Sequence, residues 1–534
     1  MRFQDKLKTE PKDQLWNEYC GFLDLSIDEY MFIQRRLMDE QLHAWRSSPL
    51  GRELLSGAEP ESIEEFRECM PLTQYADYAD TLLPRRSEKL PGDPIIWIQT
   101  TWEGGLRPIK LAPYTREMLD TYKHNVMTVT MLAAARSKGE CNVRRGDRVL
   151  YGGAPLPYAT GLLPSLLNED VDFVWLPDDD ASSMSFSQRI KAGFSCAMKG
   201  GLDYFFAIGS VANYITENFS KATGGSGKRH AVSLPIAFRY LKAKYNCRKN
   251  GGSITPGDVF RIKGFVCAGT DSTCYKDALS RAWGVTPIEI AAGTESACIA
   301  AETWEQRGMV FFPDACFYEF IPQDEMARSA RDVSLRPRTV LMDQVRAGET
   351  YELVISVLHG GAFMRYRIGD MYRCISAGAG ALPRFTFVDR VPSIIDIAGF
   401  TRITESSISQ VLDMSRLDIS QWLAKKESDS RGFPFLHMYV EFGQDSMDRD
   451  VINREILTEH LSVYFKYFDS DYNDLKKLLG MEPLVITILK SGTVDGYRHF
   501  TGRELPRLNP SAMDIAELLS FQQKFGPNGG AVTQ

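Results

Sequence analysis

The sequence lacks the segments that would place a protein in or across a membrane. No apolar run approaches the roughly 20 residues that a membrane-spanning helix needs, and the amino-terminal segment has no apolar secretion core. The 10 cysteines include no Cys-x-x-Cys pair, and the 7 histidines are scattered. This usage indicates reduced thiols, because disulfide frameworks and zinc sites need regular spacings. We therefore expect a cytoplasmic protein.

The sequence also lacks an excess of positive charge. The chain has 62 Lys and Arg against 69 Asp and Glu, which gives a net charge of -7 at pH 7. Proteins whose main surface binds nucleic acid usually carry an excess of cations, so that function class is disfavoured. We expect small-molecule partners, with no nucleic acid and no membrane among them.

The chain has enough apolar material for more than one core. It has 534 residues, 44% of them hydrophobic and 25% charged, as in folded globular proteins. We predict a large domain over residues 1–390, of which 1–90 form a helical flange with Ser26 and Ser62 as N-caps. Residues 391–534 are predicted to form a small, mobile α+β domain.

The large domain shows an alternation of strand-like and helical segments. This rhythm predicts an α/β fold with mixed and largely parallel sheets. The expected strands are 95–98, 148–152, 173–176, 204–208 and 261–267, and the expected helices include 115–135 and 272–283. The small domain is expected to hold a helix at 406–412, a strand at 437–442, a helix at 449–468 and a strand at 484–490, with a polar loop at 424–433.

Two predicted strands end in small and hydroxyl-bearing residues. One runs from Phe265 to Gly269 and Thr270, and the next ends at Ala292, Gly293, Thr294 and Glu295 before an expected helix over 296–304. Such residues suit the ligand crevice at the carboxyl ends of a parallel sheet. The carboxylate of Glu295 could hold Mg²⁺ against nucleotide phosphates, or it could be an acid favoured by a helix dipole.

Three further segments carry candidate ligand-binding groups. The first is TTWEGGLRPIK at 100–110, where Thr100, Thr101 and the glycines could present donors to phosphates, although such residues also form ordinary turns. In the second, a strand from Phe363 delivers Gly369 and Asp370 to a turn. The third, 385–390, ends on Asp389 and Arg390.

The order of these segments resembles the adenylate-forming superfamily of acyl-CoA synthetases, peptide-synthetase adenylation domains and luciferases. Within it, several stretches are similar to the auxin-responsive acyl-acid amido synthetase (jasmonate-amido synthetase) family and its bacterial relatives. They are YRIGDMYR at 366–373, PRFTFVDR at 383–390, WGVTPIEIAAGTES at 283–296, PDACFYEFIP at 313–322 and LPRL at 505–508. The resemblance implies a large amino-terminal adenylate-forming domain and a small carboxyl-terminal lid.

The resemblance also implies a reaction. ATP would activate a carboxylic acid as an acyl-adenylate, and the acyl group would pass to an amine such as an amino acid. Glu295 would order Mg²⁺ and, with Arg390, serve catalysis, while Asp370 would bind the ribose. The remaining nucleotide-binding positions would be Thr100, Thr101, Gly269, Thr270, Ala292, Gly293 and Thr294.

The sequence departs from the family pattern at three places. Trp102 and Glu103 interrupt the phosphate loop, Ala291 stands where an aromatic residue usually stacks on adenine, and Glu504 stands where the family has a lysine. Two alternatives therefore stay open. One is a family member that has lost or replaced adenylation and acts as a binding protein or a different enzyme.

The other alternative is an acyl-CoA ligase. Its acceptor carries a 3′-phosphate that needs a basic surface, and the cluster of Arg144, Arg145 and Arg148 could supply one.

Overall fold

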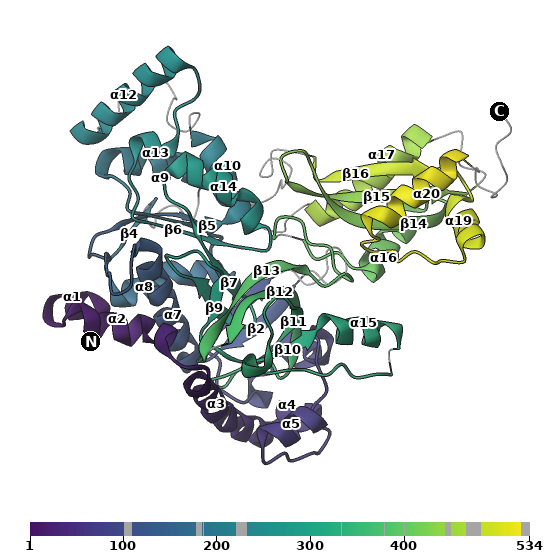
Figure 1. The fold of residues 1–534 in the computed structure, drawn as a ribbon, viewed down its shortest axis with the longest axis horizontal. Helices are drawn as coiled ribbons and strands as arrows, with labels where there is room; N and C mark the ends of the chain where they lie inside the picture. Colours follow the sequence, from purple (N-terminus) through teal and green to yellow (C-terminus); the bar gives the residue numbers. More distant parts are fainter. Residues whose placement is uncertain are drawn as a thin grey trace. The chain divides into compact units, whose positions relative to one another are not determined.

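The computed structural model describes residues 1–100, 109–177, 184, 186–219, 232–332, 334–378, 380–399, 401–443, 450–465 and 482–524. The chain divides into two compact units, one made of 1–100 with 110–389 and the other beginning at residue 390 (Figure 1). Within the described ranges, no helix is both long and apolar enough to cross a membrane.

The amino-terminal region of the first unit is helical, as predicted. Ser26 caps α3 in a capping box with Glu29, and the Ser62 side chain caps α5 by accepting a hydrogen bond from the backbone N–H of Glu65. The helices are α1 (Phe3–Thr9), α2 (Lys12–Cys20), α3 (Ile27–Ser47), α4 (Pro49–Leu54), α5 (Ile63–Cys69) and α6 (Ala79–Leu82). The buried Trp45 indole on α3 donates to the carbonyl of Gly361 at 2.8 Å, which ties these helices to the rest of the unit.

An eleven-stranded sheet forms the centre of the first unit, in the order β10-β11-β12-β13-β9-β8-β7-β6-β5-β3-β4. Strands β4, β3, β5, β6 and β7 run parallel, whereas β7 to β9 and β10 to β12 pair antiparallel. The predicted mixed α/β fold is therefore confirmed. The strands are β3 (Arg148–Gly152), β4 (Val174–Leu176), β5 (Tyr204–Ile208), β6 (Gly264–Ala268), β7 (Ile288–Gly293), β8 (Ala297–Glu302), β9 (Met309–Phe311), β10 (Cys316–Pro322), β11 (Thr350–Val357), β12 (Tyr366–Gly378) and β13 (Ala381–Arg390).

Helices cover both faces of the parallel half of this sheet (Figure 1). One layer holds α7 (Arg116–Ala134) and α8 (Leu163–Asp170). The opposite layer holds α9 (Phe186–Gly200), α10 (Gly209–Glu217), α13 (Pro256–Val259) and α14 (Ser272–Trp283), with α12 (Leu234–Asn250) beyond them and α15 (Gln323–Arg331) beside the antiparallel half. A separate hairpin pairs β1 (Ile96–Thr100) with β2 (Lys110–Tyr114), antiparallel.

Two local predictions in this unit are wrong. The expected helix at 296–304 is strand β8, whose residues Ala297–Glu302 are all buried between β7 and β9. Its alanines and terminal glutamate favour a helix intrinsically, but pairing with two neighbouring strands overrides that preference. The expected turn at Gly369 and Asp370 lies instead within the continuous strand β12.

The second unit is a small α+β body built on the sheet β14-β15-β16. Its strands are β14 (Ile419–Ser428), β15 (Pro434–Phe442) and β16 (Leu484–Leu489), and its helices are α16 (Glu405–Ser415), α17 (Asp450–Leu461), α19 (Thr493–Thr501) and α20 (Ala512–Lys524). Tyr439, Tyr497, Leu518 and Phe521 form part of its core. The predicted loop at 424–433 is wrong over 424–428, which complete β14, because each of these residues pairs with a residue of β15.

Candidate active site

The candidate site lies where three parallel strands end. Ile208 of β5 pairs with Ala268 of β6, and Ala268 pairs with Ile290 of β7, so the segments after these strands lie along one edge of the sheet. Helix α10 begins at Gly209 and α14 at Ser272, directly after β5 and β6. The first backbone N–H groups of a helix suit an anionic ligand, and this edge is the ligand crevice of open α/β sheets.

Gly269 and Thr270 follow β6 at this edge. Gly269 has a φ of 108°, and a Cβ there would lie 3.1 Å from Cγ2 of Ile208, so glycine is required. The hydroxyl of Thr270 is buried and finds no hydrogen-bond partner among the residues that the structure describes. An unsatisfied buried donor costs about 1–3 kcal/mol, so Thr270 is suited to an acceptor atom of a ligand.

Gly209 and Ser210 also lie at this edge, and the sequence reasoning missed them. A Cβ on Gly209 would lie 2.9 Å from the Cα of Ser272, so glycine allows α10 to begin against α14. Ser210 is buried in the first turn of α10. The signal in the sequence is a Gly-Ser pair directly after the apolar run at 204–208.

Glu295 belongs to a buried polar cluster with Lys110 and Tyr366. Nζ of Lys110 lies 3.1 Å from Oε1 of Glu295 and donates to the Tyr366 hydroxyl oxygen at 2.9 Å, while that hydroxyl donates to Oε1 at 3.0 Å. Lys110 is only 3% exposed, Glu295 8% and Tyr366 1%. The cluster joins β2, the β7–β8 turn and β12, three segments that are distant in the sequence.

Two aromatic rings also lie close to the Lys110 ammonium, whose Nζ lies 5.3 Å from the ring centre of Tyr75 and 5.6 Å from that of Tyr366. Such cation–π contacts are worth about 0.5–2 kcal/mol. Burial raises the pKa of the Tyr75 phenol, and the negative charge of Glu295 raises it further. Tyr75 therefore stays protonated and donates to the carbonyl of Leu111 at 3.0 Å.

The β7–β8 turn presents Thr294 and Glu295 without a following helix. The prediction that a helix follows Glu295 is wrong, because strand β8 follows it. Its carboxylate therefore has no helix dipole to stabilise it there. The Tyr114 hydroxyl donates to the Thr294 carbonyl at 2.8 Å and fixes the turn. Both cluster contacts use Oε1 of Glu295, whereas Oε2 lies 3.7 Å from the place a Cβ on Gly293 would occupy.

The protein groups present would fit Mg²⁺ only together with a nucleotide. Within the described ranges, no group of three or more His, Cys, Asp or Glu side chains could hold a metal ion. Mg²⁺ in nucleotide sites is commonly held by one or two carboxylates, with phosphates and waters as the other ligands. Glu295 is therefore suited to be such a single protein ligand.

Asp370 lies in a bulge of β12. Arg367 pairs with Val354 of β11 and Met371 pairs with Glu352, so Ile368, Gly369 and Asp370 stand opposite Leu353 alone. Gly369 has a φ of 85°. A bulge re-aims the side chains of a strand, and the half-buried Asp370 is displaced from the regular alternation in this way.

A bidentate ion pair spans this bulge, because Arg367 precedes the bulge and Glu352 lies opposite Met371, which follows it. The guanidinium of Arg367 donates to both carboxylate oxygens of Glu352 at 2.8 and 2.6 Å. The structure therefore has a bulge within a strand where the sequence predicted a turn.

The remaining predicted positions of the first unit that the structure describes lie on β1 and β7. Thr100 ends β1 opposite Lys110, and Ala291 is buried in β7 opposite Ala300. Ala292 and Gly293 complete β7 at the edge. Thr101, Trp102 and Glu103 lie outside the described residues.

Arg390 and the segment 503–508 belong to the second unit. Nε of Arg390 lies 3.3 Å from Oδ2 of the buried Asp396, whose Oδ1 accepts from the N–H of Gly399 at 2.9 Å. Glu504 is exposed, with Oε1 3.8 Å from the Arg498 guanidinium. The neighbouring Arg503 forms ion pairs with Asp514 and Glu517 at 2.6 and 2.8 Å and so has a structural role.

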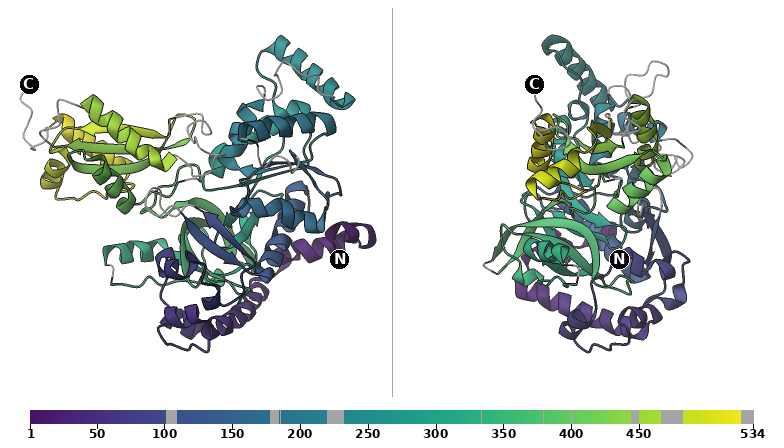
Figure 2. Two further views of the ribbon diagram at one scale, coloured as in Figure 1. Left: turned by 180° about the vertical axis from the view of Figure 1, so that it is seen from behind. Right: turned by 90° about the vertical axis from the view of Figure 1, so that its right-hand side faces the viewer.

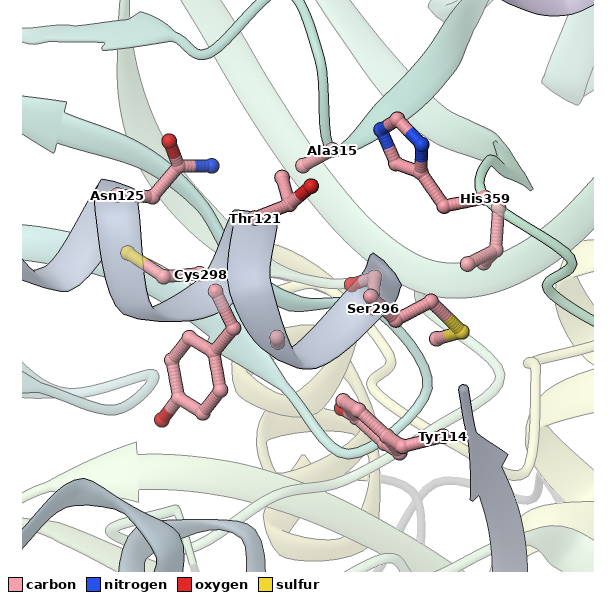
Figure 3. A pocket seen from close by; sticks show the side chains of 11 residues that line it. Tyr114, Thr121, Asn125, Ser296, Cys298, Ala315 and His359 are labelled. Atoms are coloured by element: carbon pink, nitrogen blue, oxygen red, sulfur yellow. The ribbon is translucent and has the colours of Figure 1, made fainter. Parts of the chain in front are cut away.

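A small cavity lies behind the turn (Figure 3). Thr121 and Asn125 line it from α7, Ser296 and Cys298 from the strand side, and His359 from the loop after β11. Its volume of about 10 Å³ corresponds to one water molecule. It would therefore need side-chain rearrangement before it could hold an acyl group. Residues 317–321 are buried in strand β10 and belong to the core of the first unit.

Comparisons with known proteins agree with the predicted resemblance. Residues 309–390 match the model of the GH3 family central domain, and no curated protein matches the chain. The fold is similar to that of an acyl acid amido synthetase, AtGH3.15, in complex with 2,4-DB (TM-score 0.53, 16% identity, 95% of this chain and 96% of that chain). It is also similar to 2-hydroxyisobutyryl-CoA ligase in complex with 2-HIB-AMP and CoA (TM-score 0.57, 15% identity, 93% of each chain). The adenylate-forming fold is thereby confirmed.

Proposed function

We propose that the protein is an ATP-dependent ligase that activates a carboxylic acid as an acyl-adenylate and transfers the acyl group to an amine, with amino acids as the acceptor class. The observation that carries this proposal is the buried Lys110–Glu295–Tyr366 cluster, together with the Thr270 hydroxyl that finds no partner among the described residues. Thr270 follows β6 and Glu295 follows β7, at the strand edge where the fold binds ligands. The family match at 309–390 and the likeness to two ligases support it.

In this proposal ATP, when bound, supplies the α-phosphorus that the substrate carboxylate attacks. The hydroxyls of Thr270 and Thr294 donate to nucleotide oxygens, as do Thr100 and Thr101, and Asp370 accepts from the ribose hydroxyls. Gly269, Ala292 and Gly293 are small and let the backbone approach the nucleotide. The reaction needs no nucleophilic side chain, because positioning and neutralisation of charge are the main sources of rate.

Glu295 has two roles in the proposal. Its Oε1 atom is held by Lys110 and Tyr366, and the carboxylate is the proposed ligand of Mg²⁺. Lys110 is then a positioning residue, because it acts through the Glu295 carboxylate. Arg390 is proposed to act on the nucleotide when residues 391–534 move as a lid between the two half-reactions.

The acceptor is proposed to be an amine because two arginines of the candidate surface for CoA already have partners within the protein. The guanidinium of Arg148 donates to the carbonyls of Gly201 and Cys196, both at 3.0 Å, and Nε of Arg145 lies 3.0 Å from the Asp172 carboxylate. Two of the three arginines in that cluster therefore already have partners that a 3′-phosphate would have to displace.

The test is isotope exchange between pyrophosphate and ATP in Mg²⁺, run across a panel of carboxylic acids. An acid that supports exchange is then combined with amino acids or with CoA, and the product is identified by mass spectrometry. Exchange at limiting ATP should fall about 10–100-fold in Asp370→Asn, as for loss of the charge from a carboxylate that accepts the ribose hydrogen bonds. If no acid supports exchange and calorimetry detects no ATP binding, the ligase proposal fails.

A further inference from the structure

Helix α12 carries an exposed apolar stripe. Leu234, Phe238, Leu241 and Tyr245 are 86%, 70%, 64% and 66% exposed. Their spacing puts them on one face, within about 60° of each other at roughly 100° per residue. Figures 1 and 2 show α12 projecting away from the helices that cover the sheet. An aligned set of large apolar side chains in water marks an interaction surface.

The opposite face fixes the orientation of the helix. Ile236 and Ala243 are each 4% exposed and face the body of the unit. The Arg239 guanidinium donates to the carbonyl of Val259 at the end of α13 at 3.1 Å. The N–H of Ser233, just before α12, donates to the carbonyl of Met198 on α9. The stripe is therefore held facing outward and cannot be buried by rolling the helix.

The stripe is flanked by positive charge. Residues 234–250 contain Arg239, Lys242, Lys244, Arg248 and Lys249 and no acidic residue, although the whole chain has a net charge of -7. Lys242 and Lys249 fall on one side of the stripe, and Lys244 and Arg248 fall on the other. All four of these side chains are exposed. Cations are thus concentrated where the apolar side chains are presented.

We propose that α12 binds the surface of an anionic phospholipid bilayer. The apolar stripe would enter the boundary between headgroups and acyl chains, and the flanking lysine and arginine heads would meet lipid phosphates while their stems cover apolar surface. Charge decides against a second copy of the chain, because pairing the α12 helices would bring like charges together. The expectation of no membrane partner rested on the absence of a spanning segment, which does not bear on a helix lying at the surface.

The proposal is tested by flotation of the full-length protein with lipid vesicles. Vesicles of phosphatidylcholine with about 30% phosphatidylserine provide the negative surface potential, and pure phosphatidylcholine vesicles are the comparison. The wild-type protein should float with the anionic vesicles alone, and raising the salt concentration should release it. Flotation is independent of catalysis, so its failure leaves the ligase proposal intact.

Two sets of substitutions separate the two contributions. The charge variant K242E/K244E/R248E/K249E should bind several hundred-fold more weakly, from about fivefold for each cation lost. The stripe variant L234S/F238S/L241S/Y245S should lose flotation altogether. The matched control F32S/M513S removes two exposed apolar side chains, 70% and 69% exposed, from other helices and should bind like wild type. Thermal unfolding confirms that each variant is folded.

Three results would overturn the proposal. One is no flotation of the wild type with anionic vesicles, and another is equal flotation with both kinds. The third is light scattering that shows a dimer of the wild type and a monomer of the stripe variant without vesicle binding, which would assign the surface to a second copy.

Discussion

The Lys110–Glu295 ion pair gives the most demanding prediction. Lys110→Met leaves the Glu295 carboxylate, 8% exposed, without its cation, and Glu295→Gln leaves the Lys110 ammonium, 3% exposed, without its anion. Removing one partner of a buried pair typically costs about 3–5 kcal/mol, because the remaining charge stays in a poorly solvated place. The double variant Lys110→Met with Glu295→Gln removes both charges and should cost much less than the two single costs together.

The expected change in melting temperature follows from the size of the unit. At about 2.1 cal/mol/K per residue, a unit of about 380 residues has an unfolding entropy near 0.8 kcal/mol/K. A cost of about 3–5 kcal/mol then lowers the melting temperature by roughly 4–6 °C. The double variant should recover most of this loss, so the coupling energy of the pair should be at least as large as one single cost, about 3–5 kcal/mol.

Calorimetry of the four proteins completes the double-mutant cycle, and pyrophosphate exchange measures function separately. The double variant should be folded and still lose exchange at least ~100-fold, because it lacks the proposed ligand of Mg²⁺. As a control, Lys263→Met breaks the 2.5 Å pair with Asp147 at the amino ends of β3 and β6, away from the site. It should lower stability and leave exchange unchanged. Additive costs in the cycle, or full exchange in the double variant, would refute the reasoning.

Three further outcomes are expected. Thr270→Val removes a buried hydroxyl that finds no partner in the described chain, so the stability of the protein should be unchanged or higher. The KM for ATP should increase about 5–10-fold, as for one lost hydrogen bond. An unchanged KM would place the hydroxyl outside the site. Burial raises the pKa of the Glu289 carboxyl, and nearby Glu302 raises it further. Ionisation of Glu289 therefore lowers the stability of the folded protein as pH rises through that pKa. Glu289→Gln should melt higher than wild type at pH 8, and the difference should vanish below the ordinary glutamate pKa of 4.5. Gly308→Ala should lower the melting temperature by a degree or more, because φ is +88° and the new Cβ would lie 2.9 Å from the Phe385 carbonyl oxygen; an unchanged transition would mean that the β8–β9 connection relaxes freely.

The sequence predicted the elements whose signals are local. Ser26 and Ser62 marked helix starts correctly because an N-cap is read from a few adjacent residues. The run at 297–302 was misread because its alanines favour a helix, and only the neighbouring strands β7 and β9 make it a strand. The turn predicted at Gly369 and Asp370 is a bulge within β12 instead, because pairing with β11 continues the strand on either side of it.

The site was predictable as a set of positions and not as a set of contacts. Gly269, Thr270 and Glu295 follow apolar runs, so topology alone predicts that they share the carboxyl edge of the sheet. Nothing local indicates that Lys110 and Tyr366 meet at Oε1 of Glu295, since the three residues come from distant parts of the chain. In the same way, the stripe on α12 is apolar by pattern, and only the burial of Ile236 and Ala243 shows that it faces water.

The cluster changes how substitutions at Glu295 should be interpreted. An alanine at this position would remove the proposed metal ligand and also strand the Lys110 ammonium between the Tyr75 and Tyr366 rings. Loss of activity in that variant would therefore report a damaged core as readily as a lost catalytic group. Because Lys110 and Glu295 neutralise each other, only a variant that removes both charges isolates chemistry from folding. The catalytic role of Glu295 thus depends on an arrangement that the fold must first stabilise, and the two roles separate only in the double variant.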